Sequence, residues 1–138
     1  MKLRGPREQL AGVCWLPRFI DKAKLFLAGE LPPEYADGFC SSRAMDGVFL
    51  NFFALEKDGF IEAVRDAGGD DAQVANWFRA QPQATPEKIG DWNELAPRIG
   101  APGQRGYEIF SARVRERYPN APYTGVESAF EVIEADEA

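Results

Sequence analysis

Apolar residues recur three and four positions apart along most of the chain, and this spacing constrains the fold more than any other feature of the sequence. Residues 16–28 are the clearest case, because Gly29 follows them where a helix favours a left-handed terminator. Pro17 fits the first turn, where a missing N–H costs nothing. Five residues form the apolar face of this segment: Leu16, Phe19, Ile20, Ala23 and Leu27. The spacing predicts a helix here.

Further segments combine helical spacing with capping signals. These segments are residues 43–56, 58–67, 70–78, 85–97, 107–118 and 124–133. Asp70 and Thr124 each precede a Gln or Glu by three positions, which is the spacing of a capping box. No stretch alternates with period two over more than about four residues, and no Asn-Gly turn separates candidate strands. We therefore expect an all-α fold, a single compact helical domain of about five to seven helices over residues 1–138, in which residues 105–138 could form a C-terminal helical subunit.

Charge and residue usage exclude several classes of function. The net charge is −6, so we expect neither a nucleic-acid nor a membrane partner. The chain has no histidine, which excludes a Ser-His-Asp or Cys-His arrangement and removes the commonest transition-metal ligand. We therefore expect no metal site and no cofactor. Because the longest apolar runs are far shorter than a bilayer span and the N-terminus lacks the apolar core of a signal peptide, we expect a cytoplasmic protein. In that compartment Cys14 and Cys40 should be free thiols.

Charged side chains on two otherwise apolar helices are the most informative polar feature. On a helical wheel Arg18 and Asp21 lie opposite the apolar face together with Leu25, which predicts that the helix is contacted on two sides and that this pair is half-buried. Asp46 projects between apolar positions of the next helix, and a buried carboxylate needs a donor. Arg18 is the natural candidate to reach Asp46. The alternative is a structural ion pair, with Asp46 favoured near its helix start by the helix dipole.

These residues define the candidate site. If Trp15 and Tyr35 line a cavity with Arg18, they provide apolar walls and one charged group that orients an anionic ligand. The candidate ligand-binding residues are Arg18, Asp21, Lys22, Asp46, Trp15 and Tyr35. A helical module that binds a small anionic ligand or a protein partner is the first hypothesis. An enzyme that uses Asp21 or Asp46 as a general base on an anionic small molecule is the second. A purely structural cluster is the third, and the sequence leaves the oligomeric state open.

Several motifs occur in an order that resembles a bacterial family, the domain of unknown function DUF5069. These motifs are GPRE at 5–8, LPRFIDKAK at 16–24, MDGVFLNFF at 45–53, VANWF at 74–78 and DWN at 91–93. The resemblance covers roughly residues 3–93, and the segment from Pro97 onward departs most. A Leu-Asp pair opens the second helix in the family pattern, where this chain has Met45-Asp46. The resemblance implies a small bacterial protein and assigns no activity to it.

Overall fold

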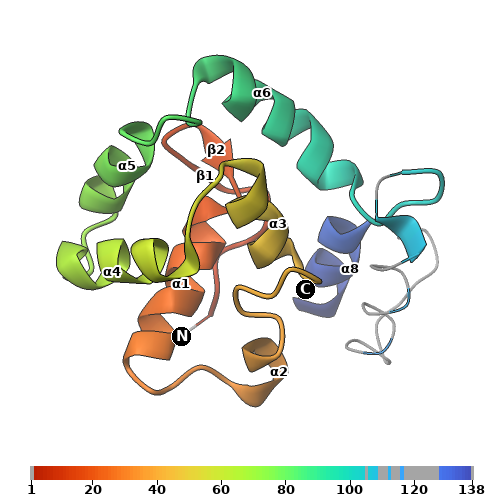
Figure 1. Ribbon diagram of the computed structural model, residues 1–138. Coiled ribbons are helices and arrows are strands. Elements are labelled where there is room, and N and C mark those ends of the chain that lie inside the picture. The colour runs from red at the N-terminus through yellow and green to blue at the C-terminus, as the bar shows by residue number, and fades with distance from the viewer. Residues whose placement is uncertain (1, 105, 109–111, 113–115, 117–127, 138) are drawn as a thin grey trace. The chain divides into compact units, whose positions relative to one another are not determined.

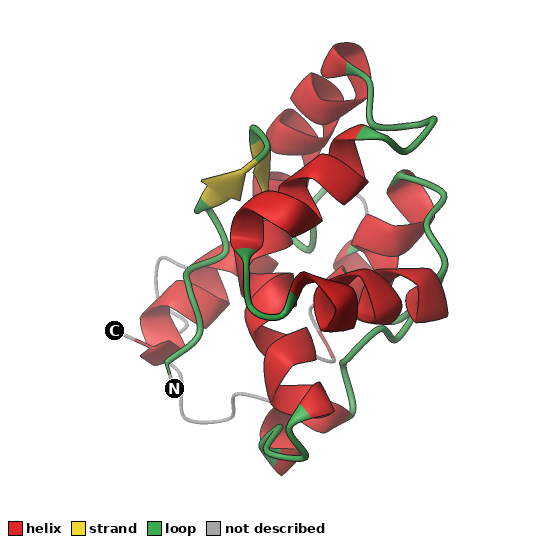
Figure 2. Cartoon of the chain, turned by 90° about the vertical axis from the view of Figure 1, so that its left-hand side faces the viewer, coloured by secondary structure: helices red, strands yellow, loops and turns green. Residues whose placement is uncertain are grey.

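The computed structural model describes residues 2–104, 106–108, 112, 116 and 128–137. The described residues contain seven α-helices, one short 3-10 helix and one two-stranded hairpin (Figures 1 and 2). In chain order the elements are β1 (Gln9–Leu10), β2 (Val13–Cys14), α1 (Leu16–Leu27), α2 (Pro33–Ala36), α3 (Met45–Phe52), α4 (Lys57–Ala67), α5 (Asp71–Arg79), α6 (Pro86–Leu95), η1 (Ala96–Arg98) and α8 (Ala129–Glu137). The predominantly helical class predicted from the sequence is confirmed.

The chain divides into two compact units, Met1–Trp92 and Asn93–Ala138. In the first unit α1 packs against α4 and against β1, and α4 packs against α5 (Figure 1). In the second unit η1 packs against α8, and the backbone N–H of Ala129 donates to the carbonyl of Ile99 at 2.9 Å. No helix in the described part of the chain has the length and apolar character that a membrane crossing requires.

The hairpin before α1 corrects the expectation of helices alone. Strands β1 and β2 pair antiparallel, with Leu10 opposite Val13, and are drawn in yellow in Figure 2. The two loop residues, Ala11 and Gly12, have φ values of 57° and 76°. Positive φ at both central positions is what a two-residue hairpin requires. The sequence did not predict this hairpin, because a positive φ is unfavourable for Ala and Ala11 therefore gives no indication of such a turn.

Helix α1 begins at Leu16 as predicted and ends at Leu27, one residue before the predicted end. Gly29 follows the helix with a φ of 71°, as predicted, and Pro17 lies in the first turn. Every residue from Leu16 to Ala23 is buried, charged residues included. The expectation that this helix is contacted on more than one side is therefore confirmed for its first two turns.

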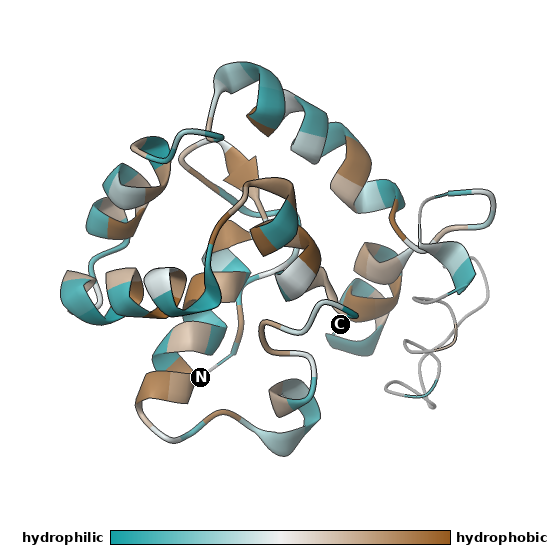
Figure 3. Cartoon of the chain, in the orientation of Figure 1, coloured by the Kyte–Doolittle hydropathy of each residue, from teal (hydrophilic) through white to brown (hydrophobic). Residues whose placement is uncertain are grey.

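Capping chemistry places several of the other helix ends. The Asp70 carboxylate accepts from the backbone N–H of Ala72 at 2.9 Å, and the Thr85 hydroxyl accepts from that of Lys88 at 3.2 Å. Gly68 ends α4 with a φ of 57°. The predicted helix over 43–56 is shorter at both ends, because α3 spans only Met45–Phe52. Teal and brown alternate along α4 and α6 in Figure 3, as expected of helices with one apolar face.

The C-terminal predictions are only partly within the described residues. Helix α8 spans Ala129–Glu137, and the Ser128 hydroxyl accepts from the backbone N–H of Glu131 at 3.2 Å. Phe130 and Ile133 are buried as predicted. Thr124, Val126 and Glu127 lie outside the described residues, as do Phe110, Val114 and Tyr118 of the predicted stripe over 107–118.

Aromatic rings form the core of the first unit. Phe19 of α1 stacks on Phe60 of α4, with ring centroids 4.0 Å apart. Phe49 of α3 meets Trp92 of α6 edge-on at 5.4 Å. The Trp92 indole N–H donates to the Cys14 carbonyl at 3.0 Å, so this buried ring has its polar atom satisfied. These contacts fix α1, α3, α4 and α6 around the residues considered next.

Candidate functional site

Helical geometry separates the charged residues of α1 into two groups. At about 100° per residue, Arg18 and Lys22 are one turn apart on the edge that begins at Trp15. Asp21 and Lys24 are three positions apart on the neighbouring edge. The carboxylates of the two groups have different partners: Asp46 contacts Lys22, and Asp21 contacts Arg4.

The first group gathers five of the six predicted site residues, and we call it the Trp15 cluster: Trp15, Arg18, Lys22, Tyr35 and Asp46. The Arg18 guanidinium carbon lies 5.6 Å from the centre of the Trp15 ring and 5.8 Å from that of Tyr35. The Lys22 ammonium lies 5.1 Å and 5.9 Å from the same two ring centres. Trp15, Arg18, Lys22 and Asp46 are all buried, and Tyr35 is half-buried. Two cations therefore share two aromatic rings.

Asp46 is the carboxylate of this cluster, and Lys22 is its charged partner. The Lys22 ammonium lies 3.3 Å from Oδ2 of Asp46, and the Trp15 indole N–H donates to Oδ1 at 2.9 Å. The backbone N–H of Cys40 donates to Oδ2 at 3.3 Å. The predicted pairing of Asp46 with Arg18 is wrong, because Lys22 and Trp15 occupy the carboxylate. Arg18 instead donates from Nη1 to the Arg4 carbonyl at 3.2 Å.

The backbone around the Trp15 cluster is held in unusual conformations. Trp15 has a φ of 76° although it is bulky, and Cys40 has a φ of 60°. Left-handed backbone at such residues costs of order 1–3 kcal/mol and persists only where surrounding contacts impose it. At Gly47, the residue after Asp46, a Cβ would overlap the backbone of Ser41 and Ser42. The segment that carries Cys40 is thus pressed directly against α3.

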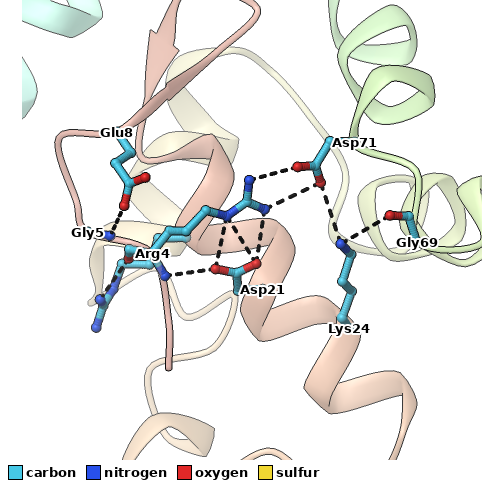
Figure 4. A network of polar contacts seen from close by, with 8 residues as sticks. Arg4, Gly5, Glu8, Asp21, Lys24, Gly69 and Asp71 are labelled. Carbon is cyan, nitrogen blue, oxygen red and sulfur yellow. Dashed lines mark hydrogen bonds and ion pairs between the residues drawn. The ribbon is translucent and has the colours of Figure 1, made fainter. Parts of the chain in front are cut away.

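The second group contains Asp21 and meets the Trp15 cluster at the Arg4 carbonyl, which accepts from Arg18. We call it the Arg4 network: Arg4, Asp21, Lys24 and Asp71 (Figure 4). The Arg4 guanidinium bonds Asp21 through Nη2 at 3.0 Å and Asp71 through Nη1 at 2.7 Å, and Lys24 approaches Asp71 at 3.5 Å. The backbone N–H of Arg4 also donates to Asp21 at 2.8 Å. Asp21 and Arg18, predicted to be half-buried, are both buried, and the partner of Asp21 is Arg4, which the sequence did not indicate.

Electrostatics within the Arg4 network follow from these contacts. Burial alone would lower the pKa of the Arg4 guanidinium, but its bonds to Asp21 and Asp71 raise that pKa above its ordinary value. The hydrogen bond from Arg4 lowers the pKa of the Asp71 carboxyl, with a further contribution from the Lys24 charge. Both shifts favour the charged forms of Arg4 and Asp71. The network ties the N-terminal segment to α1 and α5.

The cysteines are free thiols, as predicted, and neither is poised as a nucleophile. Burial raises the pKa of Cys14 to about 11. Burial, with the nearby Asp46 charge, raises the pKa of Cys40 to about 12. Because only the thiolate is an effective nucleophile, both side chains are inert at neutral pH.

Sequence reasoning missed four contributors to these groups: Arg4, Lys24, Cys40 and Asp71. Cys40 acts through its backbone N–H, which no residue identity encodes. Arg4 lies 17 positions before Asp21, and Asp71 lies 67 positions after Arg4. Nothing in local spacing predicts such distant pairs. Among the described residues, no group of three or more Cys, Asp or Glu side chains is placed to hold a metal ion.

One comparison with known proteins gives a match. The model of the protein family described as "Domain of unknown function (DUF5069)" matches residues 1–138, which includes the C-terminal segment beyond Asn93. No curated protein matches the chain.

Proposed function

Because the chain belongs to the DUF5069 family, whose description names no activity, we propose its function from the Trp15 cluster: the protein is a binding module for a small anionic ligand. Arg18 and Lys22 are the groups that attract the anion, and Trp15 and Tyr35 are the apolar walls that orient it. This composition, a few fixed polar groups on aromatic walls, is typical of small-molecule sites.

The convergence of two cations on two rings is the observation that carries the proposal. Energetically significant cation–π contacts occur about once per 70–80 residues. Here four cation–ring approaches, all within 6 Å, fall in one cluster. Arg18 adds a flat guanidinium that can bind a carboxylate or phosphate in two places, and Lys22 adds a compact charge. The strained backbone of Trp15 supports the same interpretation, because such strain concentrates at binding and active sites.

The contacts of Asp46 favour this function over an enzyme with a carboxylate base. A general base must be free to take a proton from its substrate. Both oxygens of Asp46 already accept hydrogen bonds, from Trp15, Lys22 and the Cys40 backbone. Asp46 instead positions Lys22 and Trp15. With this proposal we retain the expectation of a bacterial, cytoplasmic protein. The net charge of −6 argues against a nucleic-acid partner.

A thermal-shift experiment tests the proposal. Inorganic phosphate, a sugar phosphate, a dicarboxylate and an aromatic carboxylate are each titrated against the protein. Any anion bound only by the native state raises the melting point, and at 100 times its dissociation constant it stabilises the fold by about 2.7 kcal/mol. At least one of the four should do so.

Matched lysine variants locate the effect. Lys22→Met should abolish the shift, whereas Lys88→Met should leave it intact, because Lys88 stacks on Phe52 at 4.4 Å and contacts no member of the Trp15 cluster. Each variant loses one positive charge, so a general electrostatic effect would reduce both shifts equally. If no anion raises the melting point, or if Lys22→Met retains the full shift, the proposal fails and the structural role of the cluster is the better account.

A further inference from the structure

The segment that carries Tyr35 is attached firmly at both ends. At its start, the backbone N–H of Glu30 donates to the Leu25 carbonyl at 2.8 Å, which closes the end of α1. At its far end Phe39 is buried, with its ring 6.0 Å from that of Phe19. Cys40 follows, tied to Asp46 through its N–H. The overlap that a Cβ at Gly47 would create fixes the chain beyond Cys40 as well. Two anchors therefore bracket residues 31–37.

Between these anchors the chain buries little of its surface, and we call it weakly attached in that sense. None of residues 31–37 is buried, and this stretch includes the whole of α2. Its backbone hydrogen bonds are local: Tyr35 and Ala36 donate to the Pro32 carbonyl, and Phe39 donates back to Tyr35. Segments with little buried apolar surface and local bonding are those that open without unfolding the rest of a protein. Pro32 and Pro33 stiffen the start of the stretch, so it can move as a unit.

Tyr35 links this stretch to the Trp15 cluster. Its ring lies within 6 Å of both the Arg18 and the Lys22 charges, and it is half-exposed while Arg18 and Lys22 are buried. A ligand that reaches these cations must therefore displace something that covers them. Tyr35 is the member of the cluster that sits on a weakly attached segment, whereas Trp15, Arg18 and Lys22 lie in or next to α1, which is packed on all sides over its first two turns.

We propose that residues 31–37 are a flap, with Tyr35 as its inner side, which opens between the anchors at Glu30 and Phe39 to admit a phosphate- or carboxylate-bearing ligand to Arg18 and Lys22. The inference rests on the proposed binding function and adds the route of entry. It also assigns Tyr35 a second role: when the flap closes, the ring packs over the bound anion and its two cations.

Amide hydrogen exchange tests the flap without a ligand. The amides of Tyr35 and Ala36 should exchange about a hundredfold faster than that of Phe19 in α1, and their exchange should be nearly independent of low urea concentrations, because a local opening exposes little surface. Inorganic phosphate, at a concentration that saturates any melting-point shift, should slow exchange at these two amides. If Tyr35 and Ala36 exchange only at the rate and with the urea dependence of Phe19, the flap does not exist.

A pair of tyrosine variants tests the cover itself. In a Trp77→Phe background, which removes the half-exposed tryptophan, acrylamide quenching reports on the buried Trp15 and Trp92. Tyr35→Ala should raise the quenching several-fold. Tyr107→Ala should not, because that side chain is 44% exposed. Unchanged quenching in Tyr35→Ala would overturn the flap.

The two proposals fail separately. Local exchange at Tyr35 without any anion binding would retain the flap and reject the binding function. Anion binding together with exchange only by global unfolding would do the reverse.

Discussion

The Trp15 cluster and the Arg4 network lie on adjacent edges of one helix and use the same kinds of charged groups, yet they differ in their access to water. In the Trp15 cluster the Lys22 and Asp46 side chains are 8% and 0% exposed. In the Arg4 network the Asp21 side chain is 6% exposed, but the Arg4 and Asp71 side chains are 30% and 35% exposed. The geometry of the second group is the better of the two, with a bond of 2.7 Å against 3.3 Å.

This difference indicates that burial, rather than the length of the contact, determines how much each group contributes to the free energy of unfolding. Charges at the surface are screened, and an exposed ion pair contributes about 0–1 kcal/mol. Removing one partner of a buried pair costs about 3–5 kcal/mol, because the remaining charge stays in a poor solvent. We therefore expect the longer contact to matter more. The predictions below rank the two groups by this rule.

The largest effect should come from Asp46→Ala. The change removes the acceptor used by Trp15, Lys22 and the Cys40 backbone, so we expect a loss of about 3–5 kcal/mol in the free energy of unfolding, measured by urea denaturation. Asp58→Ala is the matched control, because Asp46 and Asp58 are each the second residue of a helix, in α3 and α4. Asp58 is exposed, so its loss should cost less than about 1 kcal/mol through the helix dipole. Equal losses in the two variants would contradict the ranking.

A substitution at Gly47, which packs against the segment that carries Cys40, should destabilise the protein nearly as much. In Gly47→Ala the new methyl group meets the backbone of Ser41, which cannot rotate away. We expect a loss of about 3 kcal/mol, the upper part of the range for overpacking. Gly90→Ala is the control within α6: its Cβ meets nothing within 4 Å, so it should stabilise the protein by about 0.5–1 kcal/mol. A neutral Gly47→Ala variant would mean that the Cys40 segment is free to shift and does not hold Asp46.

The Arg4 network should respond less to the loss of its central residue. Arg4→Met removes the side-chain donor of Asp21 and Asp71 together. The Asp21 side chain is only 6% exposed, but it keeps its hydrogen bond from the backbone N–H of residue 4, and water can reach the position of the Arg4 side chain, which is 30% exposed. Hydrogen bonds to charged groups contribute about 1.5–3 kcal/mol, and partial exposure places our expectation near the lower limit. Urea denaturation measures the loss. A cost above that of Asp46→Ala would reverse the order of the two groups.

The same comparison explains what the sequence could predict. The spacing around Arg18 predicted α1, its end at Gly29 and its unusual burial, because these depend on residues within a few positions of one another. Five of the six candidate side chains do gather in one place. The predicted partner of Asp46 was wrong, since Lys22 rather than Arg18 meets it, and the sequence indicated no partner for Asp21, which Arg4 binds. Arg18 and Lys22 lie on the same edge of α1, so a helical wheel could not show which of them binds Asp46.

Tertiary contacts fix what local patterns leave out. The φ of 76° at Trp15 has no sequence signal, because Trp disfavours that conformation and only the surrounding fold imposes it. The hairpin turn at Ala11-Gly12 was missed for the same reason. The approach of Ser41 to Gly47 joins two segments whose spacing is local but whose contact depends on the loop between them. Positions where local preference is overruled therefore surround the Trp15 cluster.

The smallest effect, and the sharpest contrast with Asp46, should come from Asp71→Asn. Because the Asp71 side chain is 35% exposed, its pairs with Arg4 and Lys24 should be worth less than about 1 kcal/mol. The fold lowers the pKa of this carboxyl, through the Arg4 hydrogen bond first. Its contribution is therefore fully present above the unfolded pKa of about 4 and is lost as the pH falls through the lower folded value.

Two measurements follow for Asp71→Asn. The stability difference from the parent protein should shrink below about pH 4 and also in about 1 M salt, where the Debye length is about 3 Å. The difference for Asp46→Ala should persist in the same salt, because solvent ions do not reach a fully buried pair. If salt reduced both differences in the same proportion, burial would not be what separates the two groups, and the assignment of Arg18 and Lys22 to a shielded site would lose its physical basis.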